Sequence, residues 1–518
     1  MFPNNSELQK ENPLESKVFG HRFRQDQTIY EYLLEFLVVL TSKKNIAPED
    51  SNDYVEEYFP NIEEASLKKI KYIPTNNVGL KRFIFFLNSK QEGRFGIDEK
   101  AFDELNEFIK GKLDITMSDD MINKEFIVKM MQNLLYGFSA VTENRSWFAQ
   151  SMLPICPSVI TTEIMGKTSA RKNKTYPDNE FRNRVDRDFE TSKYSFMARG
   201  GEIYYLHVLR ALSHYPAYKE KIELGLHNLI NQFPEMEKMC NDIQQTWLLE
   251  GLGVTGYADD EETANRVPPV VKTLGTIPDG FCSREENTLM ELCNILSSDM
   301  HPFEKLDILS YGIILQLIIM TYDQARYASG KEQGSILIDI NCYKNDSNDE
   351  IKKAAHNNYN EYSQDIVDAL FENLEGNVKE KSTEEKTISD AIDNSIKVYK
   401  KIGKRVGILK PDNEKYLRFT INEKMLKYLV LSLIKPGTKM TLDRFIEKIY
   451  EQYRLVIGPD EYIASINTRK FKVDETYLEK NKKDFQTMLK ESGFLRELSD
   501  STSIVTNPYR EVKYEDIF

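Results

Sequence analysis

The chain has 518 residues, 40% of them hydrophobic and 29% charged, and a net charge of −13. This length is too great for one hydrophobic core and predicts about three domains, while 28 tyrosines and 27 phenylalanines indicate ordered cores rather than a disordered scaffold. The acidic balance argues against a protein that coats nucleic acid over its whole surface, although local basic patches can still form. The five cysteines are scattered and odd in number, which argues against a disulfide framework or a conventional zinc ribbon and favours a reducing compartment.

Neither a leader nor a membrane span is expected. The polar start, MFPNNSELQKENP, lacks the apolar core of a secretory signal. The longest apolar run, 308–320, contains Gln316 and is shorter than the roughly 20 residues that cross a bilayer. We therefore expect a buried helix there, and a cytoplasmic protein with no membrane contact.

The first 155 residues predict a helical domain with a short strand element. Thr28 and Glu31 have capping-box spacing, and the apolar residues from Ile29 to Leu40 recur with helical period. Pro154 and Pro157 bracket a break that ends this domain. The other elements expected before that break are a strand over 81–86 and helices over 102–109 and 126–138.

A central helical domain is expected over residues 156–345, with helices near 203–215, 222–230 and 243–249 and a strand over 334–339. Its loop of residues 166–187 is the strongest basic patch of the body, and such side chains neutralise nucleic-acid phosphates. The basic residues of this loop are Lys167, Arg171, Lys172, Lys174, Arg182, Arg184 and Arg187.

One helix of the central domain carries a second polar stripe. His207, Arg210 and His214 share a face, and Arg199 with two glycines precedes the helix. These four residues could frame an anion or nucleic-acid backbone site. The simpler interpretation is a solvated face or a contact with a neighbouring domain.

Residues 346–415 predict a helical and linker region, whose first part, 346–393, has 13 acidic and 5 basic residues. One helix is indicated over 365–374, followed by the low-complexity run NVKEKSTEEKT. The remainder is expected to form a solvated face and a linker.

Three catalytic or nucleotide-binding patterns are incomplete. Residues 166–168 read Gly-Lys-Thr, but position 161 is Thr where a P-loop needs glycine. Residues 251–256 match GxGxxG, but a dinucleotide site needs a strand before the glycines and a helix after them. Here a helix is expected before them, and the acidic run YADDEE follows. Asp98, Lys100 and Asp339 could serve a Mg²⁺-dependent nuclease, although Asp98 could equally cap a helix.

Residues 416–518 predict a winged-helix-like domain. Helical runs over 425–434, 442–453 and 477–490 precede two strand-like runs over 494–498 and 503–506. In such a fold the third helix enters the DNA major groove and the hairpin lies over the backbone. Acids and bases are nearly balanced here, which favours a protein partner slightly over DNA. The candidate nucleic-acid contacts are Lys482, Lys483, Lys490 and Arg496.

Two long segments read YLVLSLIKPGTKMTLDRFIEKIYEQYRLVIGPDEY (428–462) and LKESGFLRELSDSTSIVTNPY (489–509). Two shorter segments read GLKRFIFFLNSKQEGRF (79–95) and FMARGGEIYYLHVLRAL (196–212). All four resemble proteins encoded in bacterial anti-phage defence operons beside helicase or ATPase genes. The resemblance implies a subunit that acts beside a DNA-translocating or DNA-cutting partner, and it transfers no catalytic residue.

The sequence therefore predicts a mainly α, multi-domain protein with a few short strands and a C-terminal winged-helix-like domain. The expected function is that of a non-catalytic subunit of an anti-phage defence complex, which contacts protein subunits of its operon, DNA, or both. No cofactor or metal is expected. The alternatives are a Mg²⁺-dependent nuclease and a winged-helix DNA-binding regulator.

Overall fold

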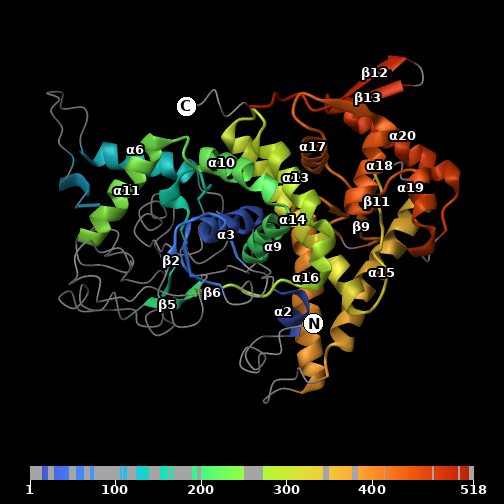
Figure 1. Cartoon of the computed structure of the whole chain (residues 1–518), viewed down its shortest axis with the longest axis horizontal. Coiled ribbons are helices and arrows are strands. Elements are labelled where there is room, and N and C mark those ends of the chain that lie inside the picture. The colour runs from blue at the N-terminus through green and yellow to red at the C-terminus, as the bar shows by residue number, and fades with distance from the viewer. Residues whose placement is uncertain are drawn as a thin grey trace.

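The computed structural model is mainly helical, as predicted, with a few short sheets (Figure 1). The residues that it describes are 14–20, 28–45, 54–62, 70–74, 106–107, 109–111, 113, 124–138, 152–161, 164–166, 189–194, 200–249, 272–341, 349–375, 383–413, 415–468, 472–499 and 502–512.

The central element is the long helix α14, Pro302–Ala328, which contains the predicted buried run. Pro302 occupies the first turn, where its missing N–H costs no hydrogen bond, and the His301 ring accepts from the Phe303 N–H at 3.3 Å. Since its middle is buried all round, other helices cover every side of it. They are α2 (Leu14–Phe19), α3 (Ile29–Thr41), α9 (Gly200–His214), α13 (Glu285–Leu296), α15 (Asp349–Glu372), α17 (Glu423–Leu433) and the short 3-10 helix η5 (Asp279–Arg284).

Helices α3 and α9 pack closely because two glycines open α9. A Cβ on Gly201 would lie only 2.4 Å from the Tyr32 carbonyl oxygen, so no larger residue fits there. The Gly201 N–H donates to the Glu35 carboxylate at 2.6 Å. At the start of α3, the Thr28 N–H donates to Glu31 at 2.5 Å, as their spacing predicts.

The acidic region holds two long helices rather than one short helix and a linker. Both α15 and α16 (Glu384–Arg405) contribute core residues, such as Leu370 and Tyr399. Residues from all four predicted segments belong to one core that runs from Leu14 to Val505. The remaining helices are α6 (Lys124–Gly137), α10 (Lys219–Ile230), α11 (Pro234–Leu249) and the 3-10 turns η3 (Pro157–Val159), η4 (Pro216–Tyr218) and η6 (Ile466–Thr468).

The strands of the body are short. An antiparallel sheet has the order β2-β1-β3-β6, and β7 lies parallel to β11. Two further antiparallel pairs are β4 with β5 and β8 with β9. Their bounds are β1 Lys43–Asn45, β2 Tyr54–Val55, β3 Lys71–Ile73, β4 Ile164–Gly166, β5 Phe189–Tyr194, β6 Lys272–Thr273, β7 Ile336–Leu337, β8 Leu409–Lys410, β9 Arg418–Phe419 and β11 Leu455–Val456.

Some sequence-based predictions fall on residues outside the described ranges. The strand over 81–86 and the GxGxxG run of 251–256 both lie there. Of the Gly-Lys-Thr run, Gly166 ends strand β4, and the two residues after it are outside the described ranges.

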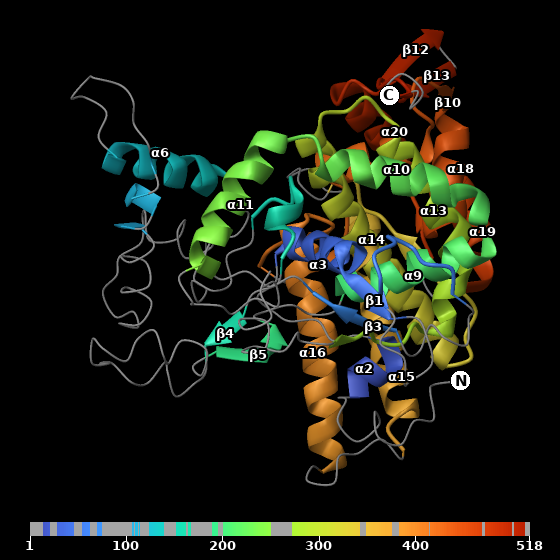
Figure 2. The ribbon, with the colours of Figure 1, turned by 60° about the vertical axis from the view of Figure 1, so that its left-hand side comes forward.

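The C-terminal segment continues from α17 through β10 (Lys439–Thr441), α18 (Leu442–Tyr453), β11, α19 (Pro459–Ala464) and α20 (Glu475–Glu491) to the hairpin of β12 (Leu495–Ser499) and β13 (Thr502–Thr506). The three predicted helices and two strands are thereby confirmed, whereas β10 was not expected. Strands β10, β13 and β12 form an antiparallel sheet in that order. In Figures 1 and 2 the β12–β13 hairpin projects at the upper edge, away from α6.

Within the described ranges, no helix combines the length and apolar character needed to cross a membrane.

Candidate functional site

Helix α20 is held in place by its ends and by one buried face. The Asp474 side chain accepts from the Thr476 N–H at 2.9 Å, and Gly493 (φ +78°) ends the helix in a left-handed conformation. Phe485 stacks on Phe445 of α18 with ring centroids 6.3 Å apart. The buried residues of α20 are Leu478, Asn481, Phe485 and Leu489.

Asn481 ties α20 to the two segments that directly follow strands β7 and β11. Its amide nitrogen donates to the Ile338 carbonyl at 3.0 Å and to the Ile457 carbonyl at 2.9 Å. Its oxygen accepts from the Ile340 N–H at 3.1 Å. Because a buried amide with satisfied donors and acceptor tolerates little rotation, these bonds fix the direction in which α20 presents its outer face.

The outer face of α20 is a stripe of lysines and threonines. Its members follow one another at steps of four and three residues, which places them in one line along a helix. Every one of them is exposed. The stripe, called the outer stripe below, consists of Thr476, Lys480, Lys483, Thr487 and Lys490.

The acidic residues of α20 lie beside this line rather than on it. By helical geometry Glu475 and Glu479 fall to one side of the outer stripe, and Asp484 and Glu491 to the other. The nearly balanced charge of the segment is therefore divided into a cationic line and two acidic margins. A count of charges along the sequence hides this division.

The predicted contact residues of this segment differ in their surroundings. Lys483, Lys490 and Arg496 are exposed, as predicted. Lys482 instead turns toward α18, where its ammonium pairs with Asp443 at 2.8 Å, so it is not part of the outer stripe.

The hairpin continues the outer stripe. Gln486 of α20 donates to the Ser503 hydroxyl at 3.0 Å, and Lys490 pairs with Glu497 of β12 at 2.9 Å. Because both contacts join α20 to the hairpin, the two elements present one surface. Lysine ammonium groups and hydroxyls on a fixed helix can contact phosphate oxygens of a nucleic-acid backbone.

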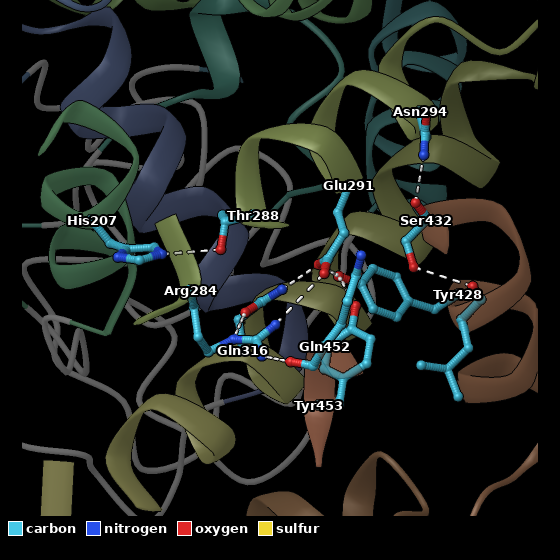
Figure 3. A network of polar contacts seen from close by, with 11 residues as sticks. His207, Arg284, Thr288, Glu291, Asn294, Gln316, Tyr428, Ser432, Gln452 and Tyr453 are labelled. Atoms are coloured by element: carbon cyan, nitrogen blue, oxygen red, sulfur yellow. Dashed lines mark hydrogen bonds and ion pairs between the residues drawn. The ribbon is translucent and has the colours of Figure 1, made fainter. Parts of the chain in front are cut away.

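The C-terminal segment is joined to the body by a buried polar network (Figure 3). Arg284 of η5 donates through Nε to Gln316 at 2.9 Å and through Nη1 to the Gln452 carbonyl oxygen. Glu291 of α13 lies 3.6 Å from the Arg284 guanidinium and accepts from Gln316 and, at 2.9 Å, from the Tyr428 hydroxyl. The network thus connects η5, α13 and α14 with α17 and α18.

Aromatic rings seal this network from water. Arg284 lies over the Tyr453 ring at 4.7 Å from its centroid, and the Tyr453 hydroxyl donates to the Tyr428 oxygen at 3.4 Å. Burial raises the pKa of the Glu291 carboxyl, an effect that Arg284 opposes. Burial likewise raises the pKa of both tyrosines well above 10.0, so they serve as hydrogen-bond donors rather than as phenolates. This arrangement is typical of a structural junction.

The predicted anion-binding stripe of α9 faces α13, with His207 and Arg210 buried and His214 exposed at the end of the helix. Arg210 and His214 both contact Glu285, at 2.5 Å and 2.6 Å, and His207 contacts the Thr288 hydroxyl at 3.0 Å. Burial lowers the pKa of His207 well below 6.5, with help from Arg210 and Arg284, so its ring is neutral. The Glu285 carboxylate already contacts both the Arg210 guanidinium and the His214 ring, which matches the neighbour-contact interpretation. Arg199 lies outside the described residues.

Of the three residues proposed for a Mg²⁺-dependent nuclease, only Asp339 lies in the described part of the chain. Asp339 is 1% exposed, and its carboxylate accepts from Arg418 Nε at 2.5 Å and from the Asn341 N–H at 3.1 Å. Asp98 and Lys100 lie outside the described residues. In the described part of the chain, no group of three or more His, Cys, Asp or Glu side chains is placed to hold a metal ion.

The basic loop predicted to bind nucleic acid is also outside the described ranges, so Lys167, Arg171, Lys172, Lys174, Arg182, Arg184 and Arg187 stay a prediction. The sequence patterns did not predict the network around Arg284 and Glu291. A polar residue inside an apolar helix, such as Gln316, was the available signal. The threonines of the outer stripe carry no charge, so the charge pattern did not indicate them.

No protein-family model matches this chain, and neither a curated protein nor a solved structure does.

Proposed function

We propose that this protein is a non-catalytic subunit that contacts DNA and a partner protein through its C-terminal segment, with the outer stripe as the DNA-contacting surface. One observation carries the proposal: three exposed lysines and two exposed threonines form a single line on α20, and the acids are displaced to its margins. A cationic line of this kind can neutralise successive phosphates and release counterions.

The order of the elements supports a winged-helix arrangement. Helices α17, α18 and α20 alternate with β10 and the β12–β13 hairpin, and the sheet order is β10-β13-β12. On that basis α20 is the helix that enters a major groove, and the hairpin is the wing. Helix α19 and strand β11 are additions between the second and third helices.

The wider setting rests on the resemblance of four segments to anti-phage defence proteins. We propose a subunit of such a bacterial complex, which acts in the cytoplasm beside a helicase, ATPase or nuclease from the same operon. Its partners would be those subunits and DNA. The motivating residues are 428–462 and 489–509, which include the α18 helix and the hairpin.

A partner protein is favoured at a second place on the same segment. Ile463 and Ile466 are 59% and 57% exposed, three residues apart, at the end of α19 and in η6. Large exposed apolar side chains that lie close together suit a protein contact better than a phosphate contact. This is the second candidate function, and it is compatible with the first.

The nuclease alternative receives less support from Asp339. A metal ion would have to displace Arg418, whose Nε lies 2.5 Å from a carboxylate oxygen of Asp339. The buried ion pair explains this aspartate as a structural residue that holds β9 near β7.

The proposal is tested by salt-dependent binding of the full-length protein to a labelled DNA duplex. The variant K480A/K483A/K490A should bind more weakly, and its slope of log affinity against log salt should fall by up to about 0.9 for each phosphate that is no longer neutralised. The matched control is K129A/K353A/K386A, which removes three exposed lysines from α6, α15 and α16. Equal binding of both variants, or undetectable binding of the wild type, would overturn the proposal.

A further inference from the structure

The hairpin beside the outer stripe contains an irregularity that exposes a leucine. Arg496 pairs with Ile504 and Glu497 with Ser503, but the next pairing joins Ser499 to Thr502. Leu498 is therefore the extra residue of a β-bulge and faces no residue of β13. A bulge redirects the side chain of its extra residue out of the regular alternation of the strand.

Leu498 is more exposed to solvent than the other large hydrophobic residues in the described part of the chain. Its side chain is 65% exposed, the largest fraction among the large hydrophobic residues in the described ranges. It lies near the end of the projecting hairpin, one residue after Glu497, which pairs with Lys490 of the outer stripe. The leucine and the cationic line therefore occupy adjoining parts of one surface.

An exposed leucine beside a line of lysines matches the chemistry of duplex DNA. Lysines and hydroxyls hold the phosphate backbone, while leucine is one of the residues that some DNA-binding proteins insert between base steps from the minor groove. When a helix occupies the major groove, an adjoining extended segment can reach the neighbouring minor groove. Leu498 is a leucine, and it lies on an extended segment near the end of the hairpin, so it has both the side chain and the position that such an insertion needs.

We propose that Leu498 is a wedge that partly inserts between base pairs of a DNA duplex from the minor groove and kinks it. The proposal rests on the proposed function, because the outer stripe must hold the duplex for the wedge to act. The preferred ligand is duplex DNA with an easily unstacked step, such as TA, at the position of the hairpin. Leu498 thus gives a preference for certain DNA sequences because they are easier to deform, and it needs no hydrogen bond to a base edge.

The consequence is a separation of two properties. The lysines of the outer stripe determine affinity and its salt dependence, whereas Leu498 determines how strongly the duplex bends and which base step lies at the hairpin. Removing the leucine should leave much of the electrostatic binding intact. Removing the lysines should weaken binding to every duplex alike.

The test uses the full-length protein and duplexes of equal length that carry a TA or a GC step, with a fluorophore at each end and 2-aminopurine at the step. The wild-type protein should shorten the end-to-end distance of the duplex, which reports bending, and raise the 2-aminopurine emission, which reports unstacking. Its affinity for the TA duplex should be about tenfold higher than for the GC duplex. The L498A variant should lose all three effects while it keeps its salt-dependent binding. The control L134A removes a leucine side chain that is 48% exposed on α6, away from the C-terminal segment, and should behave as wild type.

The outcomes separate the two proposals. If the wild type shows no salt-sensitive binding, the proposed function fails. If the wild type binds but neither bends nor unstacks the duplex, or if L498A bends it as strongly as the wild type, the wedge alone is overturned. If L498A instead loses capture of an operon-encoded protein and leaves the DNA signals unchanged, Leu498 belongs to a protein contact and the wedge is again overturned.

Discussion

Charged residues are used in opposite ways on the inner and outer sides of the C-terminal segment. On the inner side, Arg284 and Glu291 of the body are buried where the segment joins it, and they have fixed partners on four helices. On the outer side, the three lysines of the outer stripe, Lys480, Lys483 and Lys490, are exposed. Burial makes the inner charges costly unless every partner is present, so they specify one docking geometry. Exposure keeps the outer charges solvated and accessible to a ligand.

The largest effect is expected when one charge of the buried Arg284–Glu291 pair is removed. The Glu291→Leu variant leaves the Arg284 guanidinium buried without its carboxylate, and it also takes an acceptor from Tyr428. We expect the free energy of unfolding to fall by about 3–5 kcal/mol. Urea unfolding, followed by circular dichroism, measures this loss.

The double variant R284M/E291L is the control for that experiment. When both charges are replaced by apolar side chains of similar volume, no uncompensated charge remains, and most of the lost stability should return. A single variant that costs less than about 1 kcal/mol would show that the pair is already broken or hydrated in the folded protein.

Sequence patterns predicted the outer side better than the inner side. Helix α18 was predicted with its observed bounds because its apolar residues keep one helical period. The hairpin and α20 were predicted by equally local signals, namely one helical run and two short strand-like runs. Local signals suffice where an element is defined by its own caps and turns.

The inner side depends on contacts between distant residues. Arg210 meets Glu285, which is 75 positions away, and Arg284 meets Gln452, which is 168 positions away. The helical spacing of His207, Arg210 and His214 predicted a shared face, but not the carboxylate opposite it. Strand β10 was missed because its three residues form a strand only when β13 lies beside them. Pairings of this kind leave no periodic signal in one sequence.

A second prediction compares the two faces of α20 within one helix. The Asn481→Leu variant removes three hydrogen bonds and leaves the Ile338 and Ile457 carbonyls and the Ile340 N–H buried without this partner. We expect a loss of about 3 kcal/mol in the free energy of unfolding. The matched substitution on the outer face, Lys480→Leu, should change it by less than about 0.5 kcal/mol.

This pair of variants also separates stability from binding. Asn481→Leu should weaken DNA binding only under conditions in which the protein begins to unfold, whereas Lys480→Leu should weaken it in the fully folded protein. The same loss of stability in both variants would mean that Asn481 does not hold α20, and the fixed orientation of the outer stripe would lose its support.

The third prediction concerns a buried carboxylate whose charge is unfavourable. Asp323 of α14 is 6% exposed, and burial raises its pKa from 3.8 to about 6, although Arg284, Arg454 and Arg326 oppose the shift. Because the pKa is higher in the folded than in the unfolded protein, this group lowers stability as pH rises from about 4 to about 6. The full penalty remains at higher pH.

The Asp323→Asn variant should therefore be more stable than the wild type at pH 7.5 by up to about 3 kcal/mol, since the pKa shift is about two units and each unit corresponds to about 1.4 kcal/mol. The difference should shrink through pH 5 and vanish near pH 3, where the carboxyl is protonated in both the folded and the unfolded state. Urea midpoints across this pH range measure it, with Asp390→Asn on the exposed side of α16 as the control. A variant that is less stable at pH 7.5 would mean that the three arginines more than offset the burial of the charge, and the inner side would then draw net stability from its ionised groups.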